Sequence, residues 1–294
     1  MREGLLKYHV AAILTIIVWG VSFLNTRTLL DAGLNPSEIY IMRFTLAYLG
    51  FLGFSRGRAQ WLGWRQEWLM LLCGLTGGSI YFVAENYALT LTLVSDVAII
   101  IALTPLLTVL VARLRNHDEP FTPLMAAGSL IALAGVAILT FKDGFVWGHS
   151  MLGDLLALVA ALSWAFYSII IKRLTRQHST MTITRKTFFY GLVTSLPLLC
   201  LQQSGLSAQV IAQPAVWGNI IYLALICSMA AFFAWGRIVK GLGAIKTNNY
   251  IYLSPVVSVI SAALWLHERI SPAGYVGCAL ILAGLILTTR PGNK

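Results

Sequence analysis

Two ionisable residues stand inside long apolar stretches of this sequence, and they are the first candidates for chemistry. Arg43 lies in the stretch IYIMRFTLAYLG, and Glu85 lies in the stretch IYFVAENYALTL. A charged side chain in such a segment is costly in free energy, so by default it has a function or a specific partner. The two side chains could bind the charged ends of a zwitterionic solute, or Glu85 could carry a proton.

The positions of Arg43 and Glu85 leave two interpretations open. Each is predicted to stand about five or six residues from the same-facing end of its helix, so their depths agree within a few ångströms. The pair would then either lock two helices together as a structural ion pair or contact a substrate. A tightly paired carboxylate stays ionised near neutral pH and carries protons poorly, which favours substrate recognition over proton coupling.

Amide and aromatic side chains in the other apolar runs complete the predicted substrate site. A buried amide must find a partner on another helix or on a ligand. An aromatic-lined cavity would suit amphipathic or aromatic solutes. The predicted substrate-binding residues are Trp19, Arg43, Tyr81, Glu85, Asn86, Trp164, Tyr167 and Asn249. For each aromatic residue taken singly, helix packing is an equally good interpretation.

The composition identifies the elements that must position these residues as membrane-spanning helices. Hydrophobic residues make up 58% of the chain and charged residues 11%, whereas a soluble domain carries about 25% charge. The net charge of +10 is assigned to cytoplasmic loops, where Lys and Arg gather, and not to nucleic-acid binding. The four cysteines fall in apolar runs without metal-ligand spacing, so neither a metal nor a cofactor is expected.

A bilayer core needs about 20 apolar residues per helix, and roughly ten runs qualify. They are 8–27, 37–55, 68–90, 94–113, 122–141, 152–172, 184–201, 215–237, 245–266 and 272–289. With the N-terminus inside, the outer segments hold only three basic residues, Arg27, Lys142 and Arg269. The sequence therefore predicts an all-α integral membrane protein with ten transmembrane helices and both termini cytoplasmic.

The stretch Thr104–Thr140 is repeated later in the chain, where a second copy begins at Ser254. Proline, glutamate and glycine positions match between the copies: Pro105 with Pro255, Glu119 with Glu268, Pro123 with Pro272, Gly128 with Gly277, and Leu133-Ala134-Gly135 with Leu282-Ala283-Gly284. The chain therefore divides into two five-helix repeats, 1–143 and 144–294. Since five is odd, the second repeat must enter the membrane in the opposite sense to the first.

Inverted repeats are the architecture of secondary transporters, whose substrate site lies near the midplane between the halves. Pro105 and Pro255 interrupt the hydrogen-bond ladder of the fourth and ninth helices. They are predicted either to take part in gating or to impose fixed kinks. In Thr122-Pro123 and Ser271-Pro272 a residue with a hydroxyl group precedes a proline. Both pairs predict that the fifth and tenth helices begin with the same kind of cap.

The sequence resembles the EamA family of the drug/metabolite transporter superfamily. The resemblance rests on Trp19-Gly20, Arg43-Phe44, Ala88-Leu89, Pro105, Trp164, Pro255 and Glu268 with Leu282-Ala283-Gly284. It implies a central cavity, with the fifth and tenth helices packed outside it. It also implies transport of small metabolites, often export of amino acids, across a bacterial inner membrane. The turn Asn116–Pro120 departs from the family's pattern, so no role is assigned to it.

The absence of known catalytic motifs argues against an enzyme. The sequence contains no Walker A, HExxH or GxSxG motif. The expected function is a metabolite carrier, either passive or coupled to protons or a counter-substrate. The alternative is a membrane protein that handles lipid or forms a pore. The solute, the direction of transport and the oligomeric state are left open, and the small-residue faces of the fifth and tenth helices could pair with a neighbouring molecule.

Overall fold

The computed structural model of the chain describes residues 2–54, 61–92, 94–114, 121–140, 150–200, 206–265 and 271–289. Within these ranges every regular element is helical. Glu119, Glu268 and the turn 116–120 lie outside the described residues. What the sequence predicts about those positions therefore stays a prediction.

The helices follow the ten predicted apolar runs. The first half forms α1 (Arg2–Asp31), α2 (Pro36–Phe54), α3 (Trp64–Gly74), the π-helical η1 (Leu75–Ser79), α4 (Ile80–Leu91), α5 (Val94–Ile101), α6 (Thr104–Leu114) and α7 (Pro123–Thr140). The second half forms α8 (Met151–Leu174), α9 (Thr180–Cys200), α10 (Ala208–Ile211), α11 (Pro214–Ile221), the π-helical η3 (Tyr222–Ala230), α12 (Ala231–Leu242), α13 (Ala244–Asn248), the 3-10 η4 (Asn249–Leu253), α14 (Ser254–Trp265) and α15 (Pro272–Thr289). Only the short α10 has no counterpart in the prediction.

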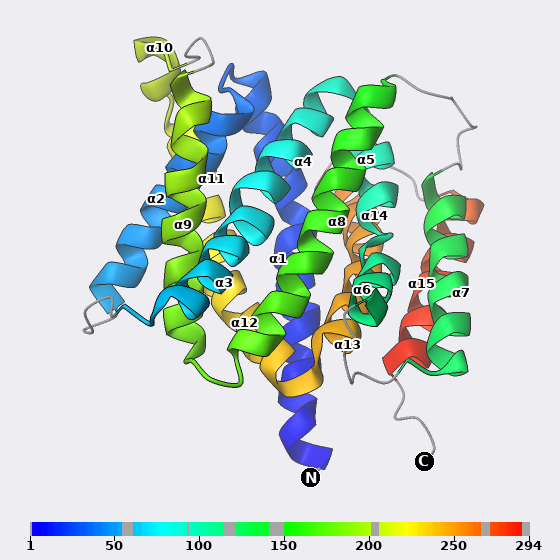
Figure 1. The fold of residues 1–294 in the computed structure, drawn as a ribbon. Coiled ribbons are helices and arrows are strands. Elements are labelled where there is room, and N and C mark those ends of the chain that lie inside the picture. The colour runs from blue at the N-terminus through cyan, green and yellow to red at the C-terminus, as the bar shows by residue number, and fades with distance from the viewer. Residues whose placement is uncertain are drawn as a thin grey trace.

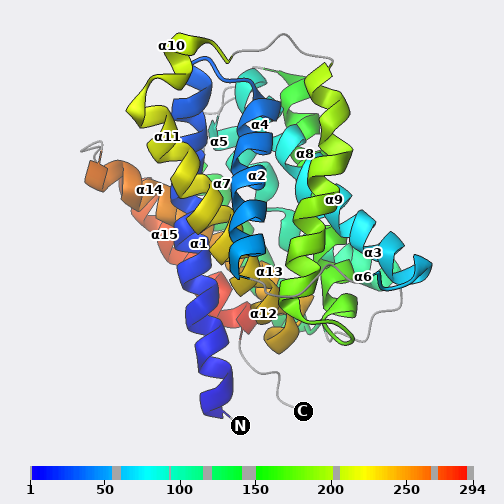
Figure 2. The same ribbon diagram turned by 90° about the vertical axis from the view of Figure 1, so that its left-hand side faces the viewer.

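Within the part of the chain that the structure describes, five helical segments are long and apolar enough to cross a membrane on their own. They are Leu5–Asp31, Trp64–Leu91, Met151–Leu174, Pro214–Leu242 and Pro272–Thr289. The other helices pack beside them into one bundle, and α1 begins at the same end at which α15 finishes (Figures 1 and 2). We call this end of the bundle the N-terminal end.

The helices α7 and α15 begin with the same cap, as predicted. The hydroxyl of Thr122 accepts a hydrogen bond from the backbone N–H of Met125 at 3.2 Å. The hydroxyl of Ser271 accepts one from the N–H of Gly274 at 3.1 Å. Each bond satisfies one of the backbone donors that a helix leaves unpaired in its first turn.

The helices α7 and α15 pack against each other at one edge of the bundle (Figure 1). Gly128 faces the backbone of Gly284, and Gly135 faces the backbone of Gly277, so the two helices run antiparallel. Gly128 and Gly277 are equivalent in the repeat, as are Gly135 and Gly284, so the contact is unchanged when the halves are exchanged. The small-residue faces that could have paired with another molecule are therefore used within the chain.

In both repeats a helix is interrupted immediately before the matched prolines, Pro105 and Pro255. A turn at Ala102–Leu103 separates α5 from α6, and the 3-10 segment η4 separates α13 from α14. Pro105 and Pro255 each occupy the second position of the helix that follows. A proline is well tolerated in the first turn of a helix because its missing N–H has no partner there. The predicted interruption of the ladder is present, whereas a gating role stays a prediction.

Candidate functional site

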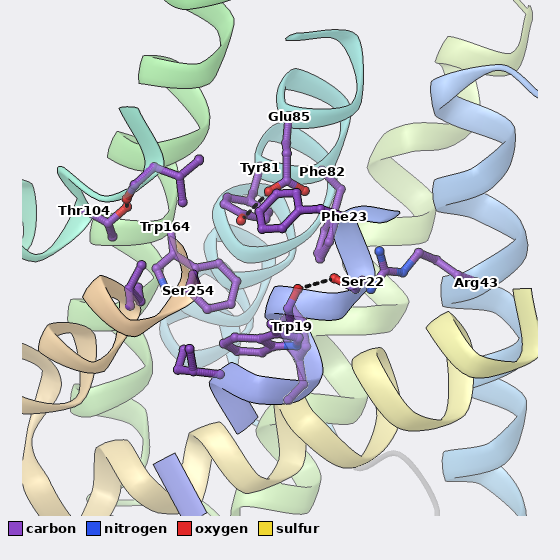
Figure 3. Close-up of a pocket in the computed structure, with 14 residues that line it drawn as sticks. Trp19, Ser22, Phe23, Arg43, Tyr81, Phe82, Glu85, Thr104, Trp164 and Ser254 are labelled. Carbon is purple, nitrogen blue, oxygen red and sulfur yellow. Dashed lines mark hydrogen bonds between the residues drawn. The ribbon is translucent and has the colours of Figure 1, made fainter. Parts of the chain in front are cut away.

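A cavity lies in the middle of the bundle, where the helix breaks of the two halves meet (Figure 3). Its volume is about 50 Å³, room for a few water molecules. Its walls come from α1, α2, α4, α5, α6, α8, α12, η4 and α14. The lining residues are Ile16, Trp19, Ser22, Phe23, Arg43, Tyr81, Phe82, Glu85, Ile101, Thr104, Trp164, Phe232, Ile251 and Ser254.

The walls of the cavity are built from equivalent residues of the two halves. Phe82 and Phe232 stand 150 positions apart in the sequence, the same separation as between Pro105 and Pro255. The same separation relates Ile101 to Ile251 and Thr104 to Ser254. The pseudo-two-fold relation of the repeats therefore runs through the cavity, as expected for a site formed between inverted repeats.

Arg43 brings a cation from α2 to the cavity wall. The side chain is buried, and its Nε donates a hydrogen bond to the hydroxyl of Ser228, in η3, at 2.9 Å. The guanidinium carbon lies 4.5 Å from the ring centroid of Phe82, a cation–π contact that favours the charged group in this apolar setting. Its two terminal nitrogens have no hydrogen-bond partner among the described residues, so they are available for a ligand.

Glu85 brings a carboxyl group from α4 to the same cavity. Its Oε1 accepts a hydrogen bond from the hydroxyl of Tyr81 at 2.7 Å (Figure 3). Arg43 and Glu85 are both described by the structure, and no ion pair within 4.0 Å joins them. The two opposite charges therefore face one cavity while each is held by a neutral partner. The structural ion pair, one of the two interpretations left open by the sequence, is not formed in this arrangement.

Trp19 and Trp164 meet across the cavity, edge to face, with ring centroids 5.3 Å apart. Phe232 and Trp235 lie within about 6 Å of both rings and complete an aromatic cluster. The indole nitrogen of Trp19 donates to the carbonyl of Cys227 at 2.8 Å. The indole nitrogen of Trp164 is buried and has no hydrogen-bond partner in the described part of the chain. An unpaired buried donor is uncommon and calls for a physical explanation.

The remaining predicted site residues lie outside the cavity lining. Asn86 points away and donates to the carbonyl of Pro36 at 3.1 Å. Tyr167 is buried behind Trp164, with ring centroids 5.1 Å apart. Asn249 is buried in η4, which contributes only Ile251 to the lining. The substrate roles predicted for these three residues stay predictions.

Several lining residues were missed by sequence reasoning, although the repeat carried a signal for them. Phe232, Thr104 and Ser254 are apolar or weakly polar, so residue type alone does not distinguish them from packing residues. The separation of 150 pairs Phe232 with Phe82, which follows Tyr81, and pairs Ser254 with Thr104 beside Pro105. Extending the repeat from the prolines to every position near Tyr81 would have found them.

The fold and the cavity define the class of protein. A bundle of apolar helices with a charged, aromatic cavity between inverted repeats is a multi-pass membrane protein of the carrier type. Among the described residues no group of three or more His, Cys, Asp or Glu could hold a metal ion. The chain belongs to the EamA-like transporter family, whose model matches residues 6–141 and again 151–290.

Named relatives of this chain are transporters. A protein of Streptantibioticus cattleyicolor named "Probable terminal-alkyne amino-acid exporter" is 30% identical, with 95% of this chain and 92% of that protein covered. The "Probable amino-acid metabolite efflux pump" of Escherichia coli is 25% identical over 96% of this chain and 94% of its own length. A solved crystal structure at 23% identity superposes with a TM-score of 0.77 and covers 96% of this chain and 98% of its own, which shows the shared fold.

Proposed function

We propose that this protein exports amino acids or related zwitterionic metabolites across a bacterial inner membrane by alternating access. In this proposal the chain crosses the membrane ten times, with both termini in the cytoplasm. The repeats 1–143 and 144–294 form the two halves of the carrier. The family match and the names of the relatives support transport of small metabolites.

The observation that carries the proposal is the separate placement of Arg43 and Glu85 on one cavity. Had the two side chains paired with each other, their charges would be satisfied within the protein and unavailable for a ligand. Instead Arg43 is held by Ser228 and Glu85 by Tyr81, both through neutral hydroxyl groups. A zwitterion would meet Arg43 with its carboxylate and Glu85 with its ammonium group, and each contact would be a charge-assisted hydrogen bond.

The aromatic cluster supports a solute with an apolar side chain. The faces of Trp19, Trp164 and Phe232 bound the cavity. The unpaired indole N–H of Trp164 offers a further donor to a carboxylate. At about 50 Å³ the cavity is well below the roughly 300 Å³ of a ligand pocket. A metabolite therefore enters only when the helices around the cavity move apart, as alternating access requires.

Counterflow in liposomes tests the proposal. The purified protein is reconstituted with an internal pool of unlabelled amino acids, and uptake of labelled amino acids is followed with and without a pH gradient. We expect saturable counterflow, and a loss of at least about tenfold in Arg43→Ala and in Glu85→Gln, since each removes a charge-assisted contact worth about 1.5–3 kcal/mol. Flux that follows the gradient would indicate proton coupling, and indifference to it would indicate exchange.

The matched control is Arg176→Ala, which removes an equal charge from an exposed position in the turn after α8. This variant should transport like the parent protein. Normal counterflow in both Arg43→Ala and Glu85→Gln, with the variants folded and monodisperse, would remove the two residues from the site. Non-saturable flux in the parent protein would instead favour a pore.

A further inference from the structure

A buried hydrogen-bond network connects three helices immediately below the cavity. The amide nitrogen of Asn248, the last residue of α13, donates to the hydroxyl of Thr108 on α6 at 2.6 Å. The hydroxyl of Ser168 on α8 donates to the amide oxygen of Asn248 at 3.2 Å and shares its hydrogen with the carbonyl of Trp164. All three side chains are fully buried.

The network lies between the cavity and the N-terminal end of the bundle. Thr108 follows the lining residue Thr104 by one helical turn, and Ser168 follows the lining residue Trp164 by one turn. Both α6 and α8 run toward the N-terminal end at this point (Figure 1), so the network stands about 6 Å beyond the cavity floor. A solute leaving the cavity toward that end has to separate α13 from α6 and α8.

The repeat places other residue types at the positions that correspond to this network in the other halves of the pairs. Asn248 corresponds to Ala98 and Thr108 to Ser258, by the separation of 150. Ser168 corresponds to Phe23, by the separation of 145 that relates Trp19 to Trp164. Alanine and phenylalanine side chains neither donate nor accept hydrogen bonds. Two of the three members are therefore missing at the end where α5, which carries Ala98, packs against α14, which carries Ser258.

We propose that Asn248, Thr108 and Ser168 form a latch that holds the N-terminal end of the transport path closed and makes this arrangement the resting state. The proposal rests on the alternating access of the proposed function. Opening toward the N-terminal end breaks both bonds of Asn248, whereas Ala98 and Phe23, which correspond to Asn248 and Ser168 in the first half, have no side-chain group that could form such bonds. This difference in residues therefore favours the conformation that is closed at the N-terminal end, although the two halves share one fold.

The variant Asn248→Ala tests the latch without leaving a polar group unsatisfied. The hydroxyls of Thr108 and Ser168 also bond the carbonyls of Thr104 and Trp164, so each keeps an acceptor when the amide is removed. Alanine is also the residue that the first repeat carries at the equivalent position, Ala98. With Asn248→Ala, both repeats therefore carry alanine at this position, and this difference between them is removed.

The separation of α6 from α12 and α13 reports the state of the latch. Spin labels are attached to Arg113→Cys on α6 and Lys240→Cys on α12, both exposed positions, in full-length protein whose four native cysteines are replaced. Distances are measured in lipid without solute. Asn248→Ala should raise the ratio of the long-distance to the short-distance population roughly fivefold to tenfold, since it removes two interhelical hydrogen bonds.

Two variants serve as controls. Thr108→Ser keeps the hydroxyl and should leave the distances unchanged, and Ala98→Asn adds an amide at the equivalent position and should not lengthen them. An unchanged distribution in folded Asn248→Ala would overturn the latch, as would equal lengthening in Ala98→Asn. Should Asn248→Ala fail to fold, Thr108→Val decides in its place by the same criterion. Because no solute is present, failure of amino acid counterflow would leave this result interpretable.

Discussion

Two equivalent tryptophans illustrate how matching residues of the two repeats differ in their hydrogen bonds. Trp19 and Trp164 both line the cavity and touch each other. The N–H of Trp19 is bonded to the carbonyl of Cys227, whereas the N–H of Trp164 has no partner among the described residues. The polar atom of Trp19 is therefore used within the protein, whereas in the proposed function the N–H of Trp164 binds the solute.

Replacing each tryptophan by phenylalanine separates these two contributions. Trp19→Phe loses a bond and leaves the Cys227 carbonyl without this donor, so it should lower the free energy of unfolding by about 1 kcal/mol more than Trp164→Phe does. Trp164→Phe should instead raise the KM for a zwitterionic solute several-fold. Thermal unfolding in detergent and concentration-dependent counterflow measure the two effects. Equal destabilisation by both variants, with unchanged KM, would contradict the assignment.

At the scale of helices, glycine decides how closely α7 and α15 approach. Gly128 and Gly284 place backbone against backbone, and the repeat supplies the second such contact from Gly135 and Gly277. Helices in a bilayer gain little from the hydrophobic effect on association, so close van der Waals packing of small residues is a main source of their affinity. The pair of helices is therefore a closely packed support beside the cavity-forming helices.

A methyl group at Gly284 should disrupt this support. A Cβ there would meet the Gly128 carbonyl and the Ala132 backbone nitrogen, and backbone atoms cannot rotate away. We expect Gly284→Ala to lower the free energy of unfolding by about 1–3 kcal/mol. The control is Gly53→Ala on α2, where a Cβ would meet nothing within 4 Å. Thermal unfolding of both variants in the same detergent gives the comparison, and equal melting temperatures would argue against the close contact.

At the scale of the whole molecule, two copies of one fold unit enclose the cavity from opposite sides. Phe82 with Phe232 and Thr104 with Ser254 line it as equivalent pairs. The charged residues break this symmetry, because Arg43 and Glu85 both come from the first half. The second half contributes aromatic and weakly polar wall residues and the amide of Asn248. The first half thus supplies both charged residues of the cavity, and the second supplies Asn248 and Ser168, two of the three residues of the proposed latch.

Reporter fusions test the orientation expected for the whole molecule. Since Lys and Arg concentrate on one side of the predicted spans, alkaline phosphatase fused after residue 294 should stay inactive in a bacterial host. The same reporter inserted at 142–144, between the repeats, should be active. A fluorescent protein that folds only in the cytoplasm should give the opposite pattern at the same two sites. Phosphatase activity at the C-terminal fusion would overturn the proposed topology.

The sequence by itself determined the helical class, the two repeats and the ionisable residues that line the cavity. These features follow from local or periodic properties, namely apolar runs, matched prolines and glycines, and the high free-energy cost of Arg43 and Glu85 in an apolar helix. The same local logic predicted the caps at Thr122 and Ser271, because a cap depends on neighbours within one turn.

Only the tertiary structure decided which polar group bonds to which. Depth along two helices could place Arg43 level with Glu85, but not choose Ser228 as the partner of one and Tyr81 as the partner of the other. Likewise Asn86 and Asn248 both needed partners, and the structure gave them Pro36 and Thr108, respectively. For the bonds between helices, the physical reason is that partner choice depends on the rotation of each helix about its axis, which is set by packing across the whole bundle. Tyr81 and Glu85 are one turn apart on α4, so their bond is local, but only the packing decided that Glu85 takes this partner and not Arg43.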